Sequence, residues 1–339
     1  MSRYESPATD DRILWDLHLS GYPLAALLAA DELGVFQALA DAPADLATFA
    51  SRTGFSERAL RALLPMLAAM GLLVTRNGVY SITSSTRSFL LPGSPYYWGP
   101  VLDRLRQLPP PHIALARALK DQNRIESAPL NAWESGAMAE SFARMVTAYM
   151  HSHSLAAAVA MARTPALRGV QQLLDVGGGS GCYSIALAQL DPQIRCVVMD
   201  LPAVCAVAQN HIASSGVKDR VSTAAVDIFR DPWPQGVDGV LFSNVFHDWD
   251  LPTCRALAAR AFELLQPGGR VFLHEALLND LRDGPFTTAA FSIQMLLQTR
   301  GQQFTFADLT EILRAAGFVN PQYMSTHAYF SVVSALKPA

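Results

Sequence analysis

Residues 173–181 read LLDVGGGSG, an apolar run followed at once by a cluster of glycines. The run is typical of a buried β-strand, and a segment with helical apolar spacing follows it. In an open α/β sheet, ligands bind beyond the carboxyl ends of the strands, and glycine lets the backbone approach a ligand closely. This stretch therefore predicts an α/β domain that binds a nucleotide-like ligand at the glycine turn.

The spacing of these glycines weakens the case for a dinucleotide. Enzymes that bind NAD usually carry the pattern G-x-G-x-x-G, in which the pyrophosphate rests on the N-terminus of the helix. Counting from Gly177 and Gly179, the third position of that pattern is Cys182.

Two acids follow the next two predicted strands. Asp200 ends the run IRCVVMD, where its carboxylate could accept hydrogen bonds from both hydroxyls of a ribose. Asp227 follows VSTAAV and could accept from an adenine amino group, while Ile228 and Phe229 cover the ring. Together with the glycine turn, these acids indicate a ligand that contains adenosine.

The chain after residue 164 alternates between β-rich runs and helical segments. The runs are QQLLDV, IRCVVMD, VSTAAV, GVLFSN and RVFLHE. This alternation predicts a parallel sheet with helices on both faces, over residues 165–339. The last two runs, at residues 321–324 and 328–336, lie too close together for a helical crossover, so we expect an antiparallel hairpin at the sheet edge.

The N-terminal part, residues 1–164, is expected to be mainly α-helical. Within it, residues 41–84 read as two helices separated by Gly54 and then two strands joined by an Asn-Gly turn, which is typical of a winged helix. A winged-helix DNA-binding regulator is therefore an alternative function. Residues 41–76 hold four arginines against three acids, and the second helix is largely apolar, which favours a dimer interface over a DNA surface.

The composition places few limits on a small ligand but several on larger partners. Only 16% of the residues are charged and the net charge is -3, so nothing favours a nucleic acid partner. The N-terminus is polar, and no stretch approaches about 18 consecutive apolar residues, so we expect a cytoplasmic protein without membrane segments. The four cysteines form no C-x-x-C pair and are expected to be buried thiols.

Five motifs in this chain resemble the plant-type small-molecule O-methyltransferase family and its bacterial relatives, which act on natural-product intermediates. The motifs are DVGGGSG, VMDLP, DIF, HDW and QPGGRV, and the resemblance covers almost the whole chain. It implies a Rossmann-like class I methyltransferase domain, with a seven-stranded, mostly parallel sheet that ends in an antiparallel hairpin. It also implies an N-terminal dimerisation and substrate-lid domain, and hence a homodimer that acts on a small-molecule acceptor.

The resemblance further implies S-adenosylmethionine as the cofactor and S-adenosylhomocysteine as the product. Where the family commonly has a lysine, this chain has Ser243, so a backbone contact is expected there. The implied cofactor contacts are Gly177, Gly179, Asp200, Leu201, Asp227, Ile228 and Ser243.

His247 is the candidate general base. It follows the apolar strand VLFSNVF, at the strand end where α/β active sites lie, and the HDW motif of the family has its base here. A phenol of pKa about 10 is mostly protonated at neutral pH, and a histidine of pKa about 6.5 can take its proton. The resemblance selects Glu275, at the end of RVFLHE, as the residue that would hold the second ring nitrogen of His247. Adjacent strand residues face opposite ways, so His274 cannot share that direction.

Gln303 stands in TRGQQFTFADL where relatives that methylate phenols often carry a second glutamate. Glutamine supplies no negative charge, so the base would be less polarised. We therefore expect an aromatic or enolic acceptor with a hydroxyl group, and two outcomes stay open. One is O-methylation, and the other is C-methylation of an electron-rich aromatic ring, aromatic amino acid or keto acid.

The same resemblance implies an acceptor pocket, although packing in a helical core is an equally good explanation for its apolar members. The expected residues are Met145, Tyr149, His153, Asn244, Phe291, Met295 and Gln298. We expect no metal, because His151 and His153 point to different faces of one helix. A non-catalytic, cofactor-binding relative is a third possible function, and His247 with Glu275 argues against it.

Overall fold

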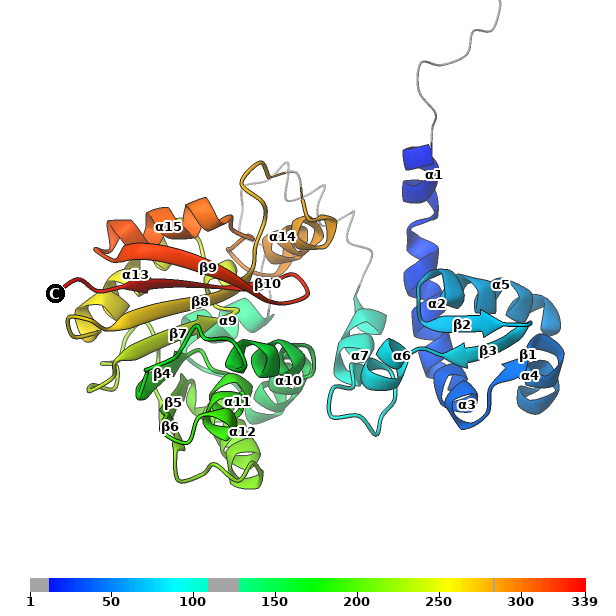
Figure 1. Cartoon of the computed structure of the whole chain (residues 1–339), viewed down its shortest axis with the longest axis horizontal. Coiled ribbons are helices and arrows are strands. Elements are labelled where there is room, and N and C mark those ends of the chain that lie inside the picture. Colours follow the sequence, from blue (N-terminus) through cyan, green and yellow to red (C-terminus); the bar gives the residue numbers. More distant parts are fainter. Residues whose placement is uncertain (1–11, 109–127, 283) are drawn as a thin grey trace, which may run out of the picture. The chain divides into compact units, whose positions relative to one another are not determined.

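The computed structural model describes residues 12–108, 128–282 and 284–339 (Figure 1). The chain forms two compact units, Met1–Arg106 and Gln107–Ala339. The polar N-terminal peptide up to residue 11 lies outside the described residues.

The first unit is mainly helical, with one small sheet. Its elements are α1 (Arg12–Leu19), α2 (Gly21–Glu32), α3 (Val35–Asp41), β1 (Ala44–Asp45), α4 (Leu46–Thr53), α5 (Glu57–Ala69), β2 (Leu73–Arg76), β3 (Val79–Ile82), α6 (Ser84–Phe89) and α7 (Gly99–Gln107). The strands pair in the order β1-β3-β2, all antiparallel. The order α4, α5, β2, β3 is the helix, helix, hairpin pattern that residues 41–84 predict.

The core of this unit forms where α2 to α5 meet the small sheet. Phe36, Phe49, Leu60, Leu64 and Leu67 are fully buried there. Within the described ranges, no single helix is both long and apolar enough to cross a membrane; α2 and α3 meet that test only jointly, by length and composition, as a pair bent by 61°.

The second unit is a three-layer α/β domain. Its elements are α9 (Ala128–Ser135), α10 (Glu140–Ala162), β4 (Gln172–Val176), α11 (Cys182–Leu190), β5 (Arg195–Asp200), α12 (Pro202–Ser214), β6 (Val221–Ala225), β7 (Gly239–Ser243), η1 (Phe246–Asp248), α13 (Leu251–Leu264), β8 (Arg270–Ala276), α14 (Phe286–Gln298), α15 (Phe306–Ala315), β9 (Val319–His327) and β10 (Phe330–Leu336). The seven strands run in the order β6-β5-β4-β7-β8-β10-β9. Only β10 runs against the other strands, and it pairs antiparallel with β8 and with β9, so the predicted mostly parallel sheet with its terminal hairpin is confirmed.

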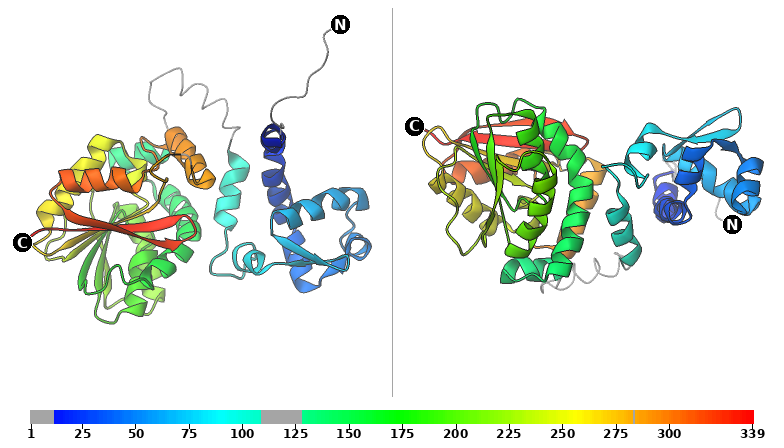
Figure 2. Two further views of the ribbon diagram at one scale, coloured as in Figure 1. Left: turned by 45° about the horizontal axis from the view of Figure 1, so that its top comes forward. Right: turned by 90° about the horizontal axis from the view of Figure 1, so that it is seen from below.

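The strand order reverses at β4, whose neighbours are β5 on one side and β7 on the other. Helices that leave these strands therefore cover opposite faces of the sheet. Helices α10, α11 and α12 pack on one face, and α13 and α15 pack on the other (Figure 2). Such a reversal opens a crevice at the carboxyl ends of the strands, which is where ligands bind in this class of fold.

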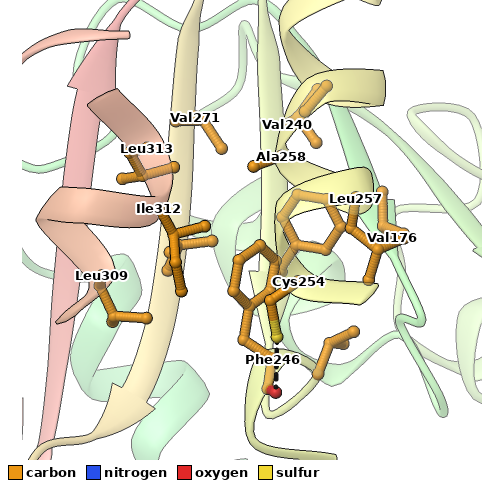
Figure 3. Close-up of a cluster of buried hydrophobic side chains, with 14 of the residues drawn as sticks. Val176, Val240, Phe246, Cys254, Leu257, Ala258, Val271, Leu309, Ile312 and Leu313 are labelled. Carbon is orange, nitrogen blue, oxygen red and sulfur yellow. Dashed lines mark hydrogen bonds between the residues drawn. The ribbon is translucent and has the colours of Figure 1, made fainter. Parts of the chain in front are cut away.

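The core under α13 and α15 also fixes the turn η1. Phe246 is fully buried among Leu257, Val271 and Ile312 (Figure 3). The Sγ of Cys254 donates a hydrogen bond of 3.2 Å to the carbonyl of Phe246, drawn as a dashed line in Figure 3. Because Phe246 precedes His247, the position of the candidate base is set by packing beneath it.

The compact units divide at a different place from the expected boundary near Thr164–Pro165. The difference is the segment with α9 and α10, which the sequence assigns to the first domain. Helix α10 packs against α11, α12 and β9. Its residues Ala158 and Met161 are buried in the same cluster as Leu173 of β4. This apolar contact places α10 in the second unit.

Candidate active site

The glycine turn follows β4 at the point where the strand order reverses. Gly177, Gly179 and Gly181 have φ of 66°, 57° and 75°, a region that side chains other than glycine rarely adopt. Gly178 is required for a different reason: there is no room for a side chain, because an added Cβ would lie 2.8 Å from Cγ1 of Val198. The turn thus packs closely against β5, as the sequence predicts for a loop that approaches a ligand.

Asp200 ends β5 beside this turn. Its Oδ2 accepts a 2.9 Å hydrogen bond from the backbone N–H of Gly179, and its Oδ1 accepts one of 2.7 Å from Leu201. Burial raises the pKa of Asp200 to about 6, although both N–H groups oppose that rise. A carboxylate oxygen can accept more than one hydrogen bond, so Asp200 keeps capacity for ligand hydroxyls.

Asp227 is engaged by a partner that the sequence analysis missed. Its Oδ2 lies 2.6 Å from Nη1 of Arg230, and its Oδ1 accepts from the N–H of Phe229 at 2.9 Å. Arg230 also donates to the carbonyl of Glu134, at the end of α9. The three-residue spacing of Asp227 and Arg230 was the available signal for this pair.

A cavity of about 1000 Å³, including space open to solvent, lies at this edge of the sheet. All seven expected cofactor contacts line it, and so does Asn244. The other lining residues are Trp133, Val146, Thr147, Met150, His151, Ser154, Gly178, Ser180, Cys182, Tyr183, Val204, Val226, Phe229, Val245, Asp248 and Trp249. The α9 and α10 members went unpredicted, because their helical spacing does not say which face meets the sheet.

His247 and Glu275 form a buried pair next to this cavity. Nδ1 of His247 lies 2.7 Å from Oε2 of Glu275, and the two residues are 3% and 1% exposed. The other oxygen of Glu275 accepts from the backbone N–H groups of Val245 and Phe246, at 3.2 and 3.0 Å. Glu275 therefore orients the imidazole and stabilises the turn that carries it.

His274 faces the other way, as strand geometry requires. Its Nδ1 is 3.1 Å from the hydroxyl of Tyr183, and its Nε2 is 2.7 Å from Oγ1 of Thr326. Burial lowers the pKa of His274 to about 3, with a further contribution from His327. It is therefore a neutral core residue.

The electrostatics of the pair favour a protonated imidazole. Burial opposes a charge on His247, but Glu275 and then Asp248 outweigh it and raise its pKa to about 9. Burial raises the pKa of Asp248 to about 7, with His247 opposing the rise and Glu275 adding to it. Asp248 Oδ1 lies 3.8 Å from Nε2 of His247. An imidazole with this pKa is mostly protonated at pH 7, so a role as a base would require that it first lose its proton.

Gln303 lies in a loop that crosses the HDW turn. The N–H of Arg300 donates to the carbonyl of Asp248 at 3.2 Å, and a Cβ at Gly301 would overlap the carbonyl oxygen of His247. Gln303 is 1% exposed, its N–H donates to Oγ of Ser292, and its carboxamide has no hydrogen-bonding partner in the part of the chain that the structure describes. The need for glycine at 301 also went unpredicted.

Three of the expected acceptor residues lie near His247, either directly or through a neighbour. The ring of Phe291 on α14 lies 5.1 Å from the ring of His247. Burial and then His247 lower the pKa of His153 to about 4, and Tyr149 packs edge-on against His153 at 5.1 Å.

The remaining expected residues lie on α14 and α10. Met295 is buried within α14, Gln298 ends the same helix, and Met145 on α10 is 51% exposed. Of the two histidines on α10, it is His151 that lines the cavity, whereas His153 is not among the lining residues. Among the described residues, no group of three or more His, Cys, Asp or Glu side chains is placed to hold a metal ion.

Comparison with known proteins covers both parts of the chain. A family model described as an O-methyltransferase domain matches residues 115–319, and one described as an O-methyltransferase dimerisation domain matches residues 15–92. The chain is 36% identical to 3-hydroxy-5-methyl-1-naphthoate 3-O-methyltransferase of Streptomyces sahachiroi, over 90% of this chain and 88% of the relative.

Two further proteins are similar in part or in fold. L-tyrosine C(3)-methyltransferase of Streptomyces lavendulae is 34% identical over 162 residues, which is 48% of this chain and 46% of the relative. The crystal structure of human N-acetylserotonin methyltransferase in complex with S-adenosylmethionine has a TM-score of 0.78 at 26% identity, covering 99% of this chain and all of that one.

Proposed function

The chain belongs to the O-methyltransferase family, and from this premise we propose that it transfers the methyl group of S-adenosylmethionine to a hydroxyl oxygen of a small aromatic acceptor. The hydrogen bond from His247 Nδ1 to Glu275 is the observation that carries the proposal. It leaves Nε2 of the neutral imidazole as the proton acceptor, which is the role of a general base.

The cavity residues fit this cofactor. Asp200 keeps lone pairs for the ribose hydroxyls, and Ile228 with Phe229 offers apolar cover for an adenine. The carboxylates of Asp200, Asp227 and Asp248 all line the cavity and suit a cationic ligand. When bound, S-adenosylmethionine supplies an activated methyl group on a sulfonium.

His247 is matched to a phenolic proton. Its pKa of about 9 lies close to the value of about 10 for a phenol, so proton transfer between them is nearly balanced. Glu275 keeps the proton on Nδ1 before transfer and stabilises the imidazolium afterwards. General base catalysis of this kind contributes about 10² to 10⁴ in rate.

Gln303 points to an acceptor with a second oxygen. Its buried carboxamide can donate to a carbonyl or carboxylate of the acceptor, whereas a glutamate at this position would carry a charge that repels an anionic acceptor. The relative from S. sahachiroi is named for a hydroxylated naphthoate, which carries such a carboxylate. We therefore propose a hydroxylated aromatic acid as the acceptor class.

C-methylation is the second candidate. The neutral Gln303 and the similarity to L-tyrosine C(3)-methyltransferase over about half of the chain favour it. In that reaction His247 would take the phenolic proton, and the ring carbon next to the hydroxyl would be the nucleophile. O-methylation is preferred because the similarity to an O-methyltransferase extends over 90% of the chain.

We further propose that the N-terminal unit forms a homodimer. The match to a dimerisation domain covers residues 15–92. Helices α1 and α2 carry exposed apolar side chains at Ile13, Leu17, Tyr22 and Leu24, which a second copy would cover.

The test of the reaction uses methyl-labelled S-adenosylmethionine with hydroxynaphthoates, hydroxybenzoates, simple phenols and tyrosine. We expect a methoxy product from the hydroxylated acids, identified by its mass and by the NMR shift of the labelled methyl group. A methyl group on a ring carbon would support the second candidate. Binding of S-adenosylhomocysteine without transfer to any acceptor of these classes would contradict both.

A further inference from the structure

His151 is a titratable side chain in the cavity that the proposed proton transfer does not use. It lies on α10, and its Nδ1 is 2.8 Å from the Oγ of Ser180 in the glycine turn. Both residues line the cavity, and Ser180 is buried. A single hydrogen bond between side chains therefore joins α10 to the turn.

The sequence of the turn explains why a hydrogen bond to the side chain of Ser180 can affect the conformation of the whole turn. Four of the residues 177–181 are glycine, so Ser180 carries the one side chain by which the turn can be held. Ordering a glycine costs more backbone entropy than ordering any other residue. The start of the turn is held by backbone hydrogen bonds to Met199 and by the carboxylate of Asp200. Ser180 supplies the side-chain anchor at the other end.

The imidazole of His151 is itself held in place. Its ring stacks on the ring of His211 from α12, with centroids 4.5 Å apart and planes at 21°. Burial and then His211 lower the pKa of His151 to about 4, and burial lowers the pKa of His211. Both rings are therefore neutral at pH 7, and the stack keeps Nδ1 of His151 directed at Ser180.

We propose that His151 is a positioning residue for the cofactor: it fixes Ser180, and through Ser180 it holds the glycine turn in the conformation that binds S-adenosylmethionine. It acts on binding and takes no part in the proton transfer at His247. Because this contact acts on cofactor binding, the affinity for S-adenosylhomocysteine reports on it in the absence of any acceptor.

The test is a double-mutant cycle on the full-length protein, with S-adenosylhomocysteine binding measured by calorimetry at pH 7.5. His151→Phe keeps a ring for the stack but removes Nδ1, and Ser180→Ala removes the hydroxyl. Loss of one hydrogen bond predicts that each single variant binds about three- to tenfold more weakly. The double variant should bind no more weakly than the weaker single variant, because the same bond is lost in all three.

Two further variants separate positioning from general damage. His151→Asn offers a carboxamide at about the place of Nδ1 and should bind within about twofold of the wild type. Gln209→Ala, on the exposed face of α12, is the surface control. In kinetics, the loss in His151→Phe and Ser180→Ala should fall on KM for S-adenosylmethionine rather than on kcat.

Three outcomes would overturn the proposal. They are additive losses in the double variant, unchanged affinity in both single variants, and a fall in kcat without a change in cofactor affinity. If thermal melting shows that His151→Phe does not fold, the other two variants decide the matter. Ser180→Ala must then weaken binding, and His151→Asn must not.

Discussion

The two sides of the proposed active site, one for the cofactor and one for the acceptor, are built in different ways. On the cofactor side, the glycine turn and Asp200 stand at the ends of neighbouring strands, and backbone N–H groups hold them. On the acceptor side, His247, Glu275 and Phe291 come from η1, β8 and α14, and side-chain contacts bring them together.

This difference separates the part of the site that the fold determines from the part that side chains determine. The strand ends place the cofactor residues wherever this topology forms, so their chemistry follows from the sheet. The acceptor side depends on contacts between η1 and α14, which are far apart in the sequence. Substitutions in these segments can change the acceptor side without altering the sheet. The two sides should therefore respond differently to substitution, the first in cofactor affinity and the second in turnover.

The largest expected effect is that of His247→Ala. Loss of the general base should lower kcat by about 10² or more, while the affinity for S-adenosylhomocysteine stays within a few-fold of the wild type. Steady-state kinetics and calorimetry on the same preparation measure the two quantities. Turnover within about tenfold of the wild type would remove His247 from the mechanism, and a parallel loss of cofactor affinity would break the division between the two sides.

Glu275→Gln should have the next largest effect and should also change the pH profile. In the wild type, kcat/KM should rise with pH up to about 9, because the pKa of His247 lies there and the neutral imidazole is the active form. Removing the charge of Glu275 should move this rise to lower pH and lower the plateau by about ten- to a hundredfold. A profile that does not move would contradict the role of Glu275.

Deprotonation of His247, which should raise activity, should lower the stability of the fold. The pKa of His247 is higher in the folded chain than in the unfolded chain, so its stabilising contribution is complete below about pH 6.5 and is lost as the pH rises through about 9. The melting temperature should thus fall over the range in which activity rises. Melting curves of the wild type and of His247→Ala between pH 6.5 and 9 provide the comparison, and the variant should lose this part of the pH dependence.

Gln303→Glu should shift the choice of acceptor. The added charge should lower kcat/KM for a hydroxylated aromatic acid by about tenfold relative to a phenol without a carboxylate. Gln302→Glu is the matched control, because it makes the same change at the exposed neighbouring position. Equal shifts in the two variants would mean that net charge alone, and no contact of Gln303, sets the preference.

The smallest expected effect is on the cofactor side, in Arg230→Ala. This change breaks the pair with Asp227, and because Arg230 is largely exposed we expect only about a threefold loss in affinity for S-adenosylhomocysteine. The value of kcat at saturating cofactor should be unchanged. Arg255→Ala, which breaks an exposed pair with Glu311, is the control. A loss that falls on kcat would contradict the expectation that substitutions on the cofactor side change cofactor affinity and not turnover.

The residues expected to contact the cofactor line one cavity, and the sequence could bring them together for a physical reason. A buried strand, a glycine turn and an acid at the next strand end are local patterns, and the topology of the sheet brings them to one edge. Residues 173–181 and Asp200 could therefore be placed from the sequence alone. The pairing of Arg230 with Asp227 was missed because many exposed arginines have an acid at this spacing.

The acceptor side was predicted mainly through the resemblance to a family. The HDW motif singled out His247. Strand alternation allows only one of His274 and Glu275 to face the site, and the resemblance selected Glu275. His151 could not be assigned, because the periodicity of α10 does not reveal that one face of this helix meets Ser180 at His151 while another approaches His247 at His153. The domain boundary differed for the same reason, since the apolar face of α10 does not indicate which unit it packs against.

The contact between Gly301 and the carbonyl of His247 also bears on how this enzyme can acquire new acceptors. Any side chain at position 301 would overlap the carbonyl oxygen of His247, so variants there should be lost from a library selected for activity. Position 303 already holds a side chain, that of the buried Gln303. A search for altered acceptor range should therefore vary residue 303 and the facing turn of α14 while keeping residue 301 as glycine.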